Sequence, residues 1–492
     1  MRLSNVLDIT GDILIQGSAE TEVTGLCSDS RRLESGAVFA ALEGAHSDGH
    51  DHIEAALAQG ATAILSNRRT LSLPANIAHI YSADPRTSFA RYCARFWSAR
   101  PDMVVAVTGT NGKTSTTDYL RQIWTRVTWP AAAMGTLGIT SSVDALNTMS
   151  ANLTTPLAED FFASVHHMKR HGITHLAFES SSHGLAQSRL AGLGVNVAVF
   201  TNLSQDHLDW HRTMEAYFEA KARLFEDNLL EGGTAVINID DEWGRKLAHR
   251  LEGKPVVVWG VGQSPDADFH ISQINRQPFG LDISVTARGE EFSMPVALSG
   301  DFQAMNVVMA AAAAHASGMP LHDCFAALTM LLPVRGRMQP VHGHPKGARI
   351  IIDYAHTPDA LEKALIALKP ETSGALRVVF GCGGDRDQAK RAQMGEIAAR
   401  IADDVIITDD NPRSENPAAI RADILTACPE AQEIALRDNA IKTAIQKLNE
   451  GDSLLIAGKG HEMVQMIGTE TLPFDDAAVA RSALSQMQGE AS

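Results

Sequence analysis

The segment 107–115, VTGTNGKTS, joins an apolar stretch to a helical one through a turn that contains glycine. Backbone N–H groups in such a turn can bind phosphates, Lys113 can reach the terminal phosphates, and the Thr114 hydroxyl can ligate Mg²⁺. The general P-loop pattern has a glycine five residues before Gly112, where this chain has Val107. The general pattern is therefore incomplete, yet a GKT between a buried strand and a helix still predicts nucleotide binding.

Three further side chains could complete such a site. Glu179 ends the apolar segment THLAFE, and a P-loop site usually needs an acid at the end of a neighbouring strand to hold Mg²⁺. His207 follows another apolar segment and is either a further ligand or a structural histidine. Lys221 shares a helical face with Tyr217 and Phe225. It either extends its ammonium to solvent or lies buried in an active site, where the neutral amine is favoured.

The segment 409–417, DDNPRSENP, holds one arginine between two prolines. Proline fixes φ and restricts the preceding residue, so this segment can be neither a helix nor a central strand. Arg413 is therefore expected on a stiff loop, where its planar fork suits a carboxylate. A surface turn with a solvated arginine is the alternative.

The C-terminal third explains how such loops could meet. The apolar strands ARIIID, LRVVF, DDVIIT and DSLLIA alternate with helical segments, which indicates a doubly wound α/β unit. Ligands bind outside the carboxyl ends of the strands in such sheets. The loops at those ends are predicted to place on one edge Asp353, His356, Arg386, Arg413 and Glu462.

The remaining chain divides on similar grounds. Continuous apolar strands at 103–108, 174–179 and 196–202 indicate a parallel sheet that is covered on both faces. Breaks near Pro101 and at PVRGRMQP suggest three α/β domains. These are an N-terminal domain over 1–98, a central P-loop-type ATPase domain over 99–335 and a Rossmann-like domain over 336–492.

Composition limits the function classes. The 492 residues include 42 Lys+Arg and 58 Asp+Glu, a net charge of −16, which argues against a nucleic-acid partner. The five scattered cysteines contain no CxxC pair, so a disulfide framework or a zinc site is not expected and a reducing cytoplasm is. The start of the chain does not look like a signal peptide, and the apolar stretch at 306–319 is too short to span a bilayer. We therefore expect a cytoplasmic protein without a membrane partner.

Taken in order, the motifs resemble those of the Mur ligase family across essentially the whole chain. They are SDSR, GTNGKTS, TTP, SSHGL, TNLSQDHLDWH, AKARLF, GRM, DYAHTPD, GCGGDRD, DNPR and GKGHE. Within the family they are most similar to the ligases that add the third residue of the peptidoglycan stem peptide. The resemblance implies that ATP phosphorylates the D-glutamate side-chain carboxylate of UDP-N-acetylmuramoyl-L-alanyl-D-glutamate. An amine then attacks the acyl phosphate.

The resemblance also implies site residues, taken position by position. Lys113, His207 and Lys221 would be catalytic. The Mg²⁺ ligands would be Thr114, Glu179, His207 and a carbamylated Lys221. ATP would bind Gly109, Thr110, Asn111, Gly112, Lys113, Thr114, Ser115, Asn306, Arg337, Asp353 and His356. The UDP-muramoyl-dipeptide would bind Leu26, Ser28, Ala45, His46, Ser47, Thr154, Thr155, Ser181, Gln187 and Arg189. One departure is Gln303, where asparagine is usual in the family.

DNPR is similar to the signature of ligases that add meso-diaminopimelate, which has a second amino-acid head where lysine has only an ammonium. Its extra carboxylate would pair with Arg413. The whole set of diaminopimelate-binding residues would be Arg386, Asp410, Asn411, Pro412, Arg413, Gly458 and Glu462. The alternatives are a ligase for L-lysine, a folate-extending ligase, a regulatory P-loop ATPase without ligation and a non-catalytic nucleotide-binding module. We expect a monomer that binds only small molecules.

Overall fold

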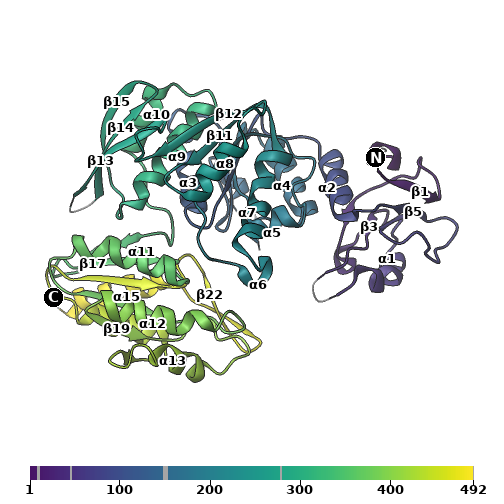
Figure 1. The fold of residues 1–492 in the computed structure, drawn as a ribbon. Coiled ribbons are helices and arrows are strands. Elements are labelled where there is room, and N and C mark those ends of the chain that lie inside the picture. The colour runs from purple at the N-terminus through teal and green to yellow at the C-terminus, as the bar shows by residue number, and fades with distance from the viewer. Residues whose placement is uncertain (8–10, 45–46, 148–152, 278–279, 491–492) are drawn as a thin grey trace.

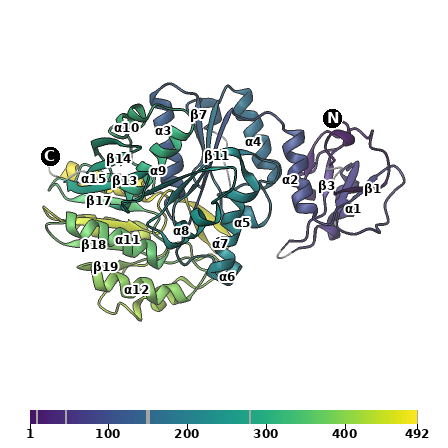
Figure 2. The same ribbon diagram turned by 45° about the horizontal axis from the view of Figure 1, so that its top comes forward.

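The computed structural model describes all of the chain except residues 8–10, 45–46, 148–152, 278–279 and 491–492. Its sheets form three bodies, and the N-terminal one projects to one side of the other two (Figures 1 and 2). Among the described residues, no helix combines the length and the apolar character that crossing a bilayer requires.

The N-terminal sheet has the strand order β1-β5-β4-β3-β2. Helix α2 follows it and lies between this sheet and the central body (Figure 1). This helix begins where it does because the Asp84 side chain accepts the Thr87 N–H and Pro85 occupies the first helical position. The elements are β1 Ile13–Gln16, β2 Leu26–Cys27, β3 Val38–Ala40, α1 Ile53–Ala58, β4 Ala63–Ser66, β5 Ala78–Tyr81 and α2 Pro85–Phe96.

The central sheet has ten strands in the order β15-β14-β13-β12-β11-β10-β6-β9-β7-β8. The predicted parallel pairing of its middle strands is confirmed, since β6 pairs in parallel with both β9 and β10. The antiparallel edges formed by β8 and by β13–β15 were not predicted. The strands are β6 Met103–Thr108, β7 Ala131–Gly135, β8 Gly138–Ser141, β9 His175–Glu179, β10 Val195–Phe200, β11 Leu229–Asn238, β12 Val257–Gly262, β13 Phe269–Gln277, β14 Gly280–Ala287 and β15 Glu290–Val296.

Helices cover this sheet, and α9 among them is strongly apolar. The alanine-rich α9 packs with α3 in a core that also contains the inward side chains of β13–β15, because small side chains allow close approach. The helices are α3 Lys113–Arg126, α4 Ala158–Arg170, α5 Ser182–Ala186, α6 Leu208–His211, α7 Met214–Arg223, α8 Glu242–Arg250, α9 Phe302–Ala316 and α10 Leu321–Leu328.

The C-terminal sheet has the order β16-β17-β21-β18-β19-β20. Strands β17, β21, β18 and β19 are parallel, with α11–α13 in the core on one face and α14 and α15 in the core on the other. The predicted doubly wound unit is therefore confirmed. Its elements are β16 Gln339–Val341, β17 Arg349–Asp353, α11 Pro358–Leu368, β18 Leu376–Phe380, α12 Ala389–Ile401, β19 Asp404–Ile407, α13 Pro417–Leu425, β20 Gln432–Glu433, α14 Arg437–Gln446, β21 Ser453–Ala457, β22 Val464–Ile467, β23 Glu470–Pro473 and α15 Asp476–Glu490.

Candidate active site

The GTNGKTS turn links β6 to α3 and needs its glycines. Gly109 and Gly112 have φ angles of 145° and 83°, and a Cβ on Gly109 would lie 1.9 Å from Thr201 Oγ1. The turn is fixed against the segment after β10, since the Thr110 N–H donates to the Asn202 carbonyl at 2.8 Å. Helix α3 then starts at Lys113 without a side-chain cap, so the N–H groups of its first turn lack helical acceptors and are available to a phosphate.

Two lysines converge on this turn. Lys113 Nζ donates to the carbonyl oxygens of Gly109 and Thr110 at 2.9 and 2.7 Å, and Lys221 Nζ donates to the same Gly109 oxygen at 2.7 Å. Burial lowers the pKa of both amines, and the nearby charge of Lys113 lowers the pKa of Lys221 further. Lys221 is only 1% exposed, so the prediction that it lies on the apolar face of its helix is confirmed. Phe225 belongs to the π-helical turn that continues α7.

Glu179, Thr114 and His207 surround the same turn. Glu179 is buried and accepts the backbone N–H and the hydroxyl of Thr136 at 2.8 and 3.1 Å. His207 is partly exposed, yet partial desolvation lowers the pKa of its imidazole to about 4. Asp206 opposes this shift, whereas the charges of His183 and the two lysines add to it, and the result favours the neutral imidazole that can ligate a metal. Carboxylate and hydroxyl oxygens suit hard divalent cations such as Mg²⁺, so these residues fit that ion.

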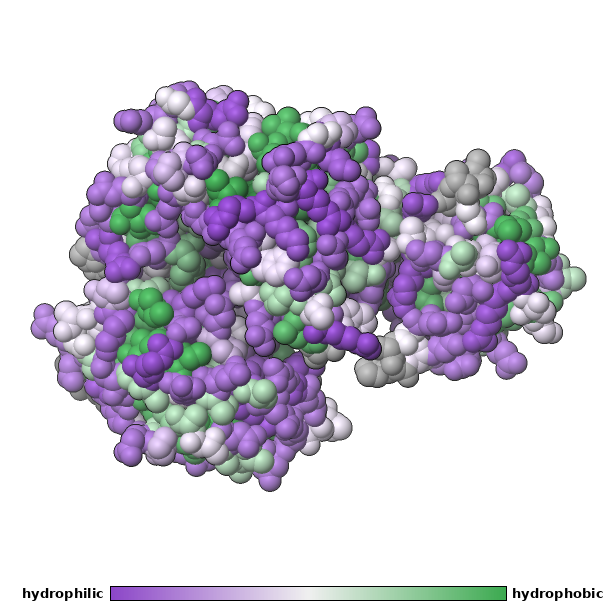
Figure 3. Space-filling model, viewed as in Figure 1, coloured by the Kyte–Doolittle hydropathy of each residue, from purple (hydrophilic) through white to green (hydrophobic). Residues whose placement is uncertain are grey.

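A cavity of about 520 Å³ opens between the central and C-terminal domains. Figure 3 shows a recess between these two parts of the molecule. The cavity unites the residues predicted for ATP, apart from Gly109: its lining includes Thr110, Asn111, Gly112, Lys113, Thr114, Ser115, Asn306, Arg337, Asp353 and His356. Gln303 also lines it and accepts a hydrogen bond from Asn306 Nδ2 at 3.0 Å.

Direct contacts connect the C-terminal domain to the turn. Arg337 Nη2 donates to Thr114 Oγ1 at 3.1 Å. Asp359, in the first turn of α11, accepts Asn111 Nδ2 at 2.8 Å and the Ser204 hydroxyl at 3.1 Å. Together these contacts connect the two domains across the cavity.

A second cluster follows β9. Thr155 Oγ1 donates to the Glu179 carbonyl at 3.0 Å and accepts the Ser181 N–H at 2.8 Å. Arg189 donates to the Thr155 carbonyl at 2.6 Å and to Gln187 Oε1 at 2.8 Å. Four of the residues predicted to bind the dipeptide therefore form one hydrogen-bonded group, and it adjoins Glu179. The Thr154 hydroxyl lies 3.2 Å from the hydroxyl of Thr136, which in turn contacts Glu179.

The residues predicted for the uridine end lie in the N-terminal domain. Leu26 is buried, and the backbone N–H and hydroxyl of Ser28 both donate to Glu159 Oε1, at 3.1 and 2.5 Å. Burial raises the pKa of Glu159, which belongs to α4 of the central domain. Ser47 Oγ lies 2.9 Å from His52 Nε2, whereas Ala45 and His46 lie outside the described residues.

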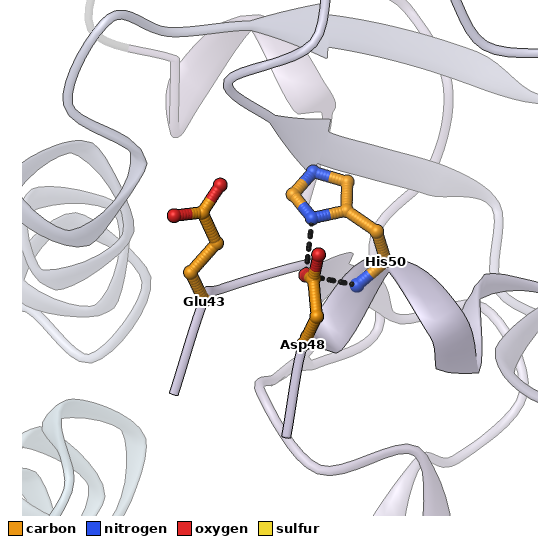
Figure 4. Close-up of side chains that lie close together, drawn as sticks. All are labelled: Glu43, Asp48 and His50. Carbon is orange, nitrogen blue, oxygen red and sulfur yellow. Dashed lines mark hydrogen bonds and ion pairs between the residues drawn. The ribbon is translucent and has the colours of Figure 1, made fainter. Parts of the chain in front are cut away.

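Glu43, Asp48 and His50 gather beside this loop (Figure 4). His50 Nδ1 pairs with Asp48 Oδ1 at 2.6 Å, and His50 Nε2 contacts Ser66 Oγ at 2.8 Å. The second Asp48 oxygen accepts from Arg68 at 2.7 Å. Both ring nitrogens of His50 are thus engaged with protein groups, and in this structure the cluster joins Asp48 to Ser66 and Arg68 through hydrogen bonds.

The C-terminal loops meet as predicted, at the carboxyl ends of β17, β18, β19 and β21. Arg413 Nη1 donates to the Gly384 carbonyl at 2.7 Å. Asn411 Nδ2 donates to Glu462 Oε2 at 2.8 Å, and Lys459 Nζ contacts both of these side chains. Asp410 and Pro412 are buried in the same loop, Asp410 Oδ2 lies against Gly458, and Arg386 is exposed on the neighbouring loop. No carboxylate among the described residues forms an ion pair with Arg413.

Comparison with known proteins decides the family. Three family profiles match in the order of the chain: "Mur ligase family, catalytic domain" at 22–91, "Mur ligase middle domain" at 107–314 and "Mur ligase, glutamate ligase domain" at 336–460. The chain belongs to the Mur ligase family. Its predicted three-part α/β fold is thereby confirmed.

Relatives of this Mur ligase span nearly its whole length. A UDP-N-acetylmuramoyl-L-alanyl-D-glutamate--2,6-diaminopimelate ligase of Zymomonas mobilis is 43% identical over 94% of this chain and 95% of the relative. The ligase of that name from Agrobacterium fabrum is 39% identical over 99% of both chains. A solved structure of a ligase with this name aligns at 33% identity and a TM-score of 0.70, over 99% of both chains. MurF ligase from Thermotoga maritima in complex with ADP shares the fold, with a TM-score of 0.64 and 18% identity over 96% of this chain and 99% of the other.

Sequence reasoning missed some residues of the ligase site. Asp206 lines the cavity, and its carboxylate lies 3.3 Å from His207 Nε2. Its position immediately before His207 in the sequence could have indicated that Asp206 belongs to the same site. Asp359 was part of the quoted motif DYAHTPD, but nothing in its spacing predicted a contact with Asn111, 248 residues away.

Proposed function

We propose that this Mur ligase uses ATP to join meso-diaminopimelate to the D-glutamate side-chain carboxylate of UDP-N-acetylmuramoyl-L-alanyl-D-glutamate. The observation that carries the substrate assignment is the Arg413 guanidinium. It lies among the loops at the ligand edge of the C-terminal sheet, without a carboxylate partner among the described residues. The second carboxylate of diaminopimelate would supply that partner, and a bidentate pair would fix its orientation.

The residues of the cavity support the first step. The N–H groups of the GTNGKTS turn and the Lys113 ammonium would hold the phosphates, and Arg337 would approach them from the C-terminal domain. Thr114, Glu179, His207 and a carbamylated Lys221 would hold Mg²⁺, which neutralises charge on the transferring phosphoryl group. A glutamate carboxylate oxygen attacks the γ-phosphorus, the bond to the β-phosphate oxygen breaks, and an acyl phosphate and ADP form.

The second step is amide formation. The neutral amine of diaminopimelate attacks the acyl carbon and a tetrahedral state forms. Inorganic phosphate then leaves with the electrons of the C–O bond and takes up the proton that the amine loses. Arg413, Asn411 and Glu462 would hold the amino acid, with Arg386, Asp410, Pro412 and Gly458 completing its site. Because protein groups only position the reactants and stabilise charge, domain closure through Asp359 and Arg337 is central to the rate.

The other substrate would lie along the central and N-terminal domains. We infer that Thr154, Thr155, Ser181, Gln187 and Arg189 hold the muramoyl-dipeptide next to Glu179. The loop 45–47 with Leu26 and Ser28 would hold the uridine end. We also infer domain boundaries near residues 98 and 335, and a monomeric state. We infer that the enzyme acts in the cytoplasm, where its five buried cysteines can remain reduced.

A steady-state assay tests this function. Phosphate release is measured with ATP, Mg²⁺ and the UDP-muramoyl-dipeptide, with meso-diaminopimelate, L-lysine or no amino acid. We expect turnover with diaminopimelate and little with lysine. Equal turnover with lysine would contradict the substrate assignment, and phosphate release that needs no amino acid would support a regulatory ATPase instead.

A further inference from the structure

We propose that the β22–β23 hairpin is a positioning element for amino-acid selection, and that Gln465 is its key side chain. The inference rests on the proposed function, because it concerns how the Arg413 loop is held for its substrate. Four hydrogen bonds connect residues 465–468 of the hairpin to residues 410–413 of the DNPR loop. The hairpin lies at the edge of the C-terminal domain, where Figure 1 labels β22.

Two of these bonds fix the backbone of Arg413 itself. Its N–H donates to the Met466 carbonyl at 3.1 Å, and its carbonyl accepts the Gly468 N–H at 2.7 Å. Arg413 has a φ of 50°, in the left-handed region that residues other than glycine rarely adopt. A conformation of this kind persists only where the surroundings impose it, and the hairpin holds the peptide groups on both sides of the Arg413 Cα.

The other two bonds hold the residues just before it. Gln465 Nε2 donates to the Asp410 carbonyl at 2.7 Å, and both groups are buried. The Met466 N–H donates to Asn411 Oδ1 at 3.0 Å, while the Asn411 amide donates to Glu462. The hairpin therefore aligns the DNPR loop with the GKGHE loop, which contains Glu462. These two loops would bind opposite ends of the amino acid.

The hairpin contributes little to the core of its domain. Every residue of β23 is exposed, and Met466, Ile467 and Leu472 present apolar side chains to solvent. The GCGGDRD loop also holds the DNPR loop: the Gly384 N–H donates to the Asn411 carbonyl, and the Ser414 hydroxyl donates to the Asp385 carboxylate. The inward hydrogen bonds, and not burial of apolar surface, are thus the principal contacts of the hairpin with the site.

Gln465→Met tests the inference, since methionine has a similar volume but no amide donor. We expect the KM for diaminopimelate to rise at least about tenfold, because this is the effect of losing one buried hydrogen bond. The KM for ATP and the Tm should change little. Gly468→Pro removes the N–H and forbids the positive φ, so it should act in the same direction and more strongly. Leu472→Ser, on the exposed strand of the hairpin, is the matched control and should leave all constants unchanged.

Two results would overturn the inference. One is an unchanged KM for diaminopimelate in both Gln465→Met and Gly468→Pro. The other is a parallel decline of every kinetic constant with the Tm, which indicates a general structural role. A wild-type enzyme that does not use diaminopimelate would overturn the proposed function as well, whereas an active wild type with unaffected variants would overturn only the role of the hairpin.

Discussion

Lys113 and Lys221 donate to one and the same acceptor, the Gly109 carbonyl oxygen, at 2.9 and 2.7 Å. Two ammonium groups this close repel one another, and burial disfavours the charge on each. Burial lowers the pKa of both amines, and the charge of Lys113 lowers the pKa of Lys221 further, which favours the neutral amine at Lys221. A neutral amine is the form that reacts with CO₂ to give a carbamate, and a carbamate would turn a repulsive pair into an attractive one.

The first prediction is that Lys221 binds CO₂. In ¹³C-bicarbonate the wild-type enzyme should give a carbamate NMR signal, and Lys221→Arg should lack it and lose ligase activity, because arginine cannot form a carbamate. Lys246→Arg is the control, since Lys246 is exposed and its ammonium lies over the ring of the partly buried Trp243. A signal that persists in Lys221→Arg would place the modification elsewhere.

The second prediction concerns Gly135, at the end of β7. A Cβ there would lie 2.3 Å from Glu179 Oε1, so Gly135→Ala should displace this carboxylate. We expect the Mg²⁺ concentration needed for half-maximal activity to rise by about 10- to 100-fold, as for other losses of support around a metal ligand. Gly11→Ala, where an added Cβ meets nothing within 4 Å, should behave like the wild type. An unchanged Mg²⁺ requirement in Gly135→Ala would argue against Glu179 as a ligand.

The third prediction is a pH effect at the contact between the N-terminal and central domains. Burial raises the pKa of Glu159 above its ordinary value of 4.5. A carboxyl with a raised pKa in the folded state stabilises the fold when protonated, and that stabilisation is lost as pH rises through the folded-state pKa. Glu159→Gln keeps an acceptor for Ser28 without the charge, so its Tm should exceed that of the wild type at neutral pH by a few degrees at most, on the order of 1 kcal/mol or less.

Thermal unfolding of both proteins between pH 4 and 8 measures this effect. The difference in Tm should shrink as pH falls towards and below the raised pKa. Asp160→Asn, which removes the exposed partner of Arg32 on the same helix, should show no such gain. A difference in Tm that does not vary with pH would mean that the Glu159 charge is not what the mutation relieves.

Much of the site could be predicted from the sequence because it depends on local pattern. Continuous apolar segments identified the parallel strands, and parallel strands bring their carboxyl ends to one edge, so Arg413 and Glu462 were predicted near one another. The helical spacing of Tyr217 and Lys221 likewise placed this lysine on the apolar face of its helix, but it left burial of the amine as one of two alternatives. These inferences need only the periodicity of each element and the topology of a doubly wound sheet.

The rest depends on contacts between residues far apart in the chain. The Ser28–Glu159 bond joins residues 131 apart, and the exact approach of Lys221 to Gly109 joins residues 112 apart. The β22–β23 hairpin was missed because its four-residue strands are mostly exposed and have a weak pattern. The antiparallel strands β13–β15 were also missed, although one face of each lies in the core. Nor does the sequence reveal that Arg413 adopts a positive φ, since its neighbours in space impose that conformation.

The central claim is that Arg413 binds the second carboxylate of diaminopimelate, and one comparison tests it most directly. The kcat/KM values of the wild type, Arg413→Ala and Arg413→Lys are measured with diaminopimelate and with L-lysine. Arg400→Ala, an exposed arginine on α12, serves as the control. Loss of a charge-assisted contact of about 2–5 kcal/mol predicts a roughly 30- to 5,000-fold decrease with diaminopimelate for Arg413→Ala. The decrease should be smaller for Arg413→Lys, and there should be little change with lysine as substrate. An equal decrease with both amino acids, or none with diaminopimelate, would contradict the account.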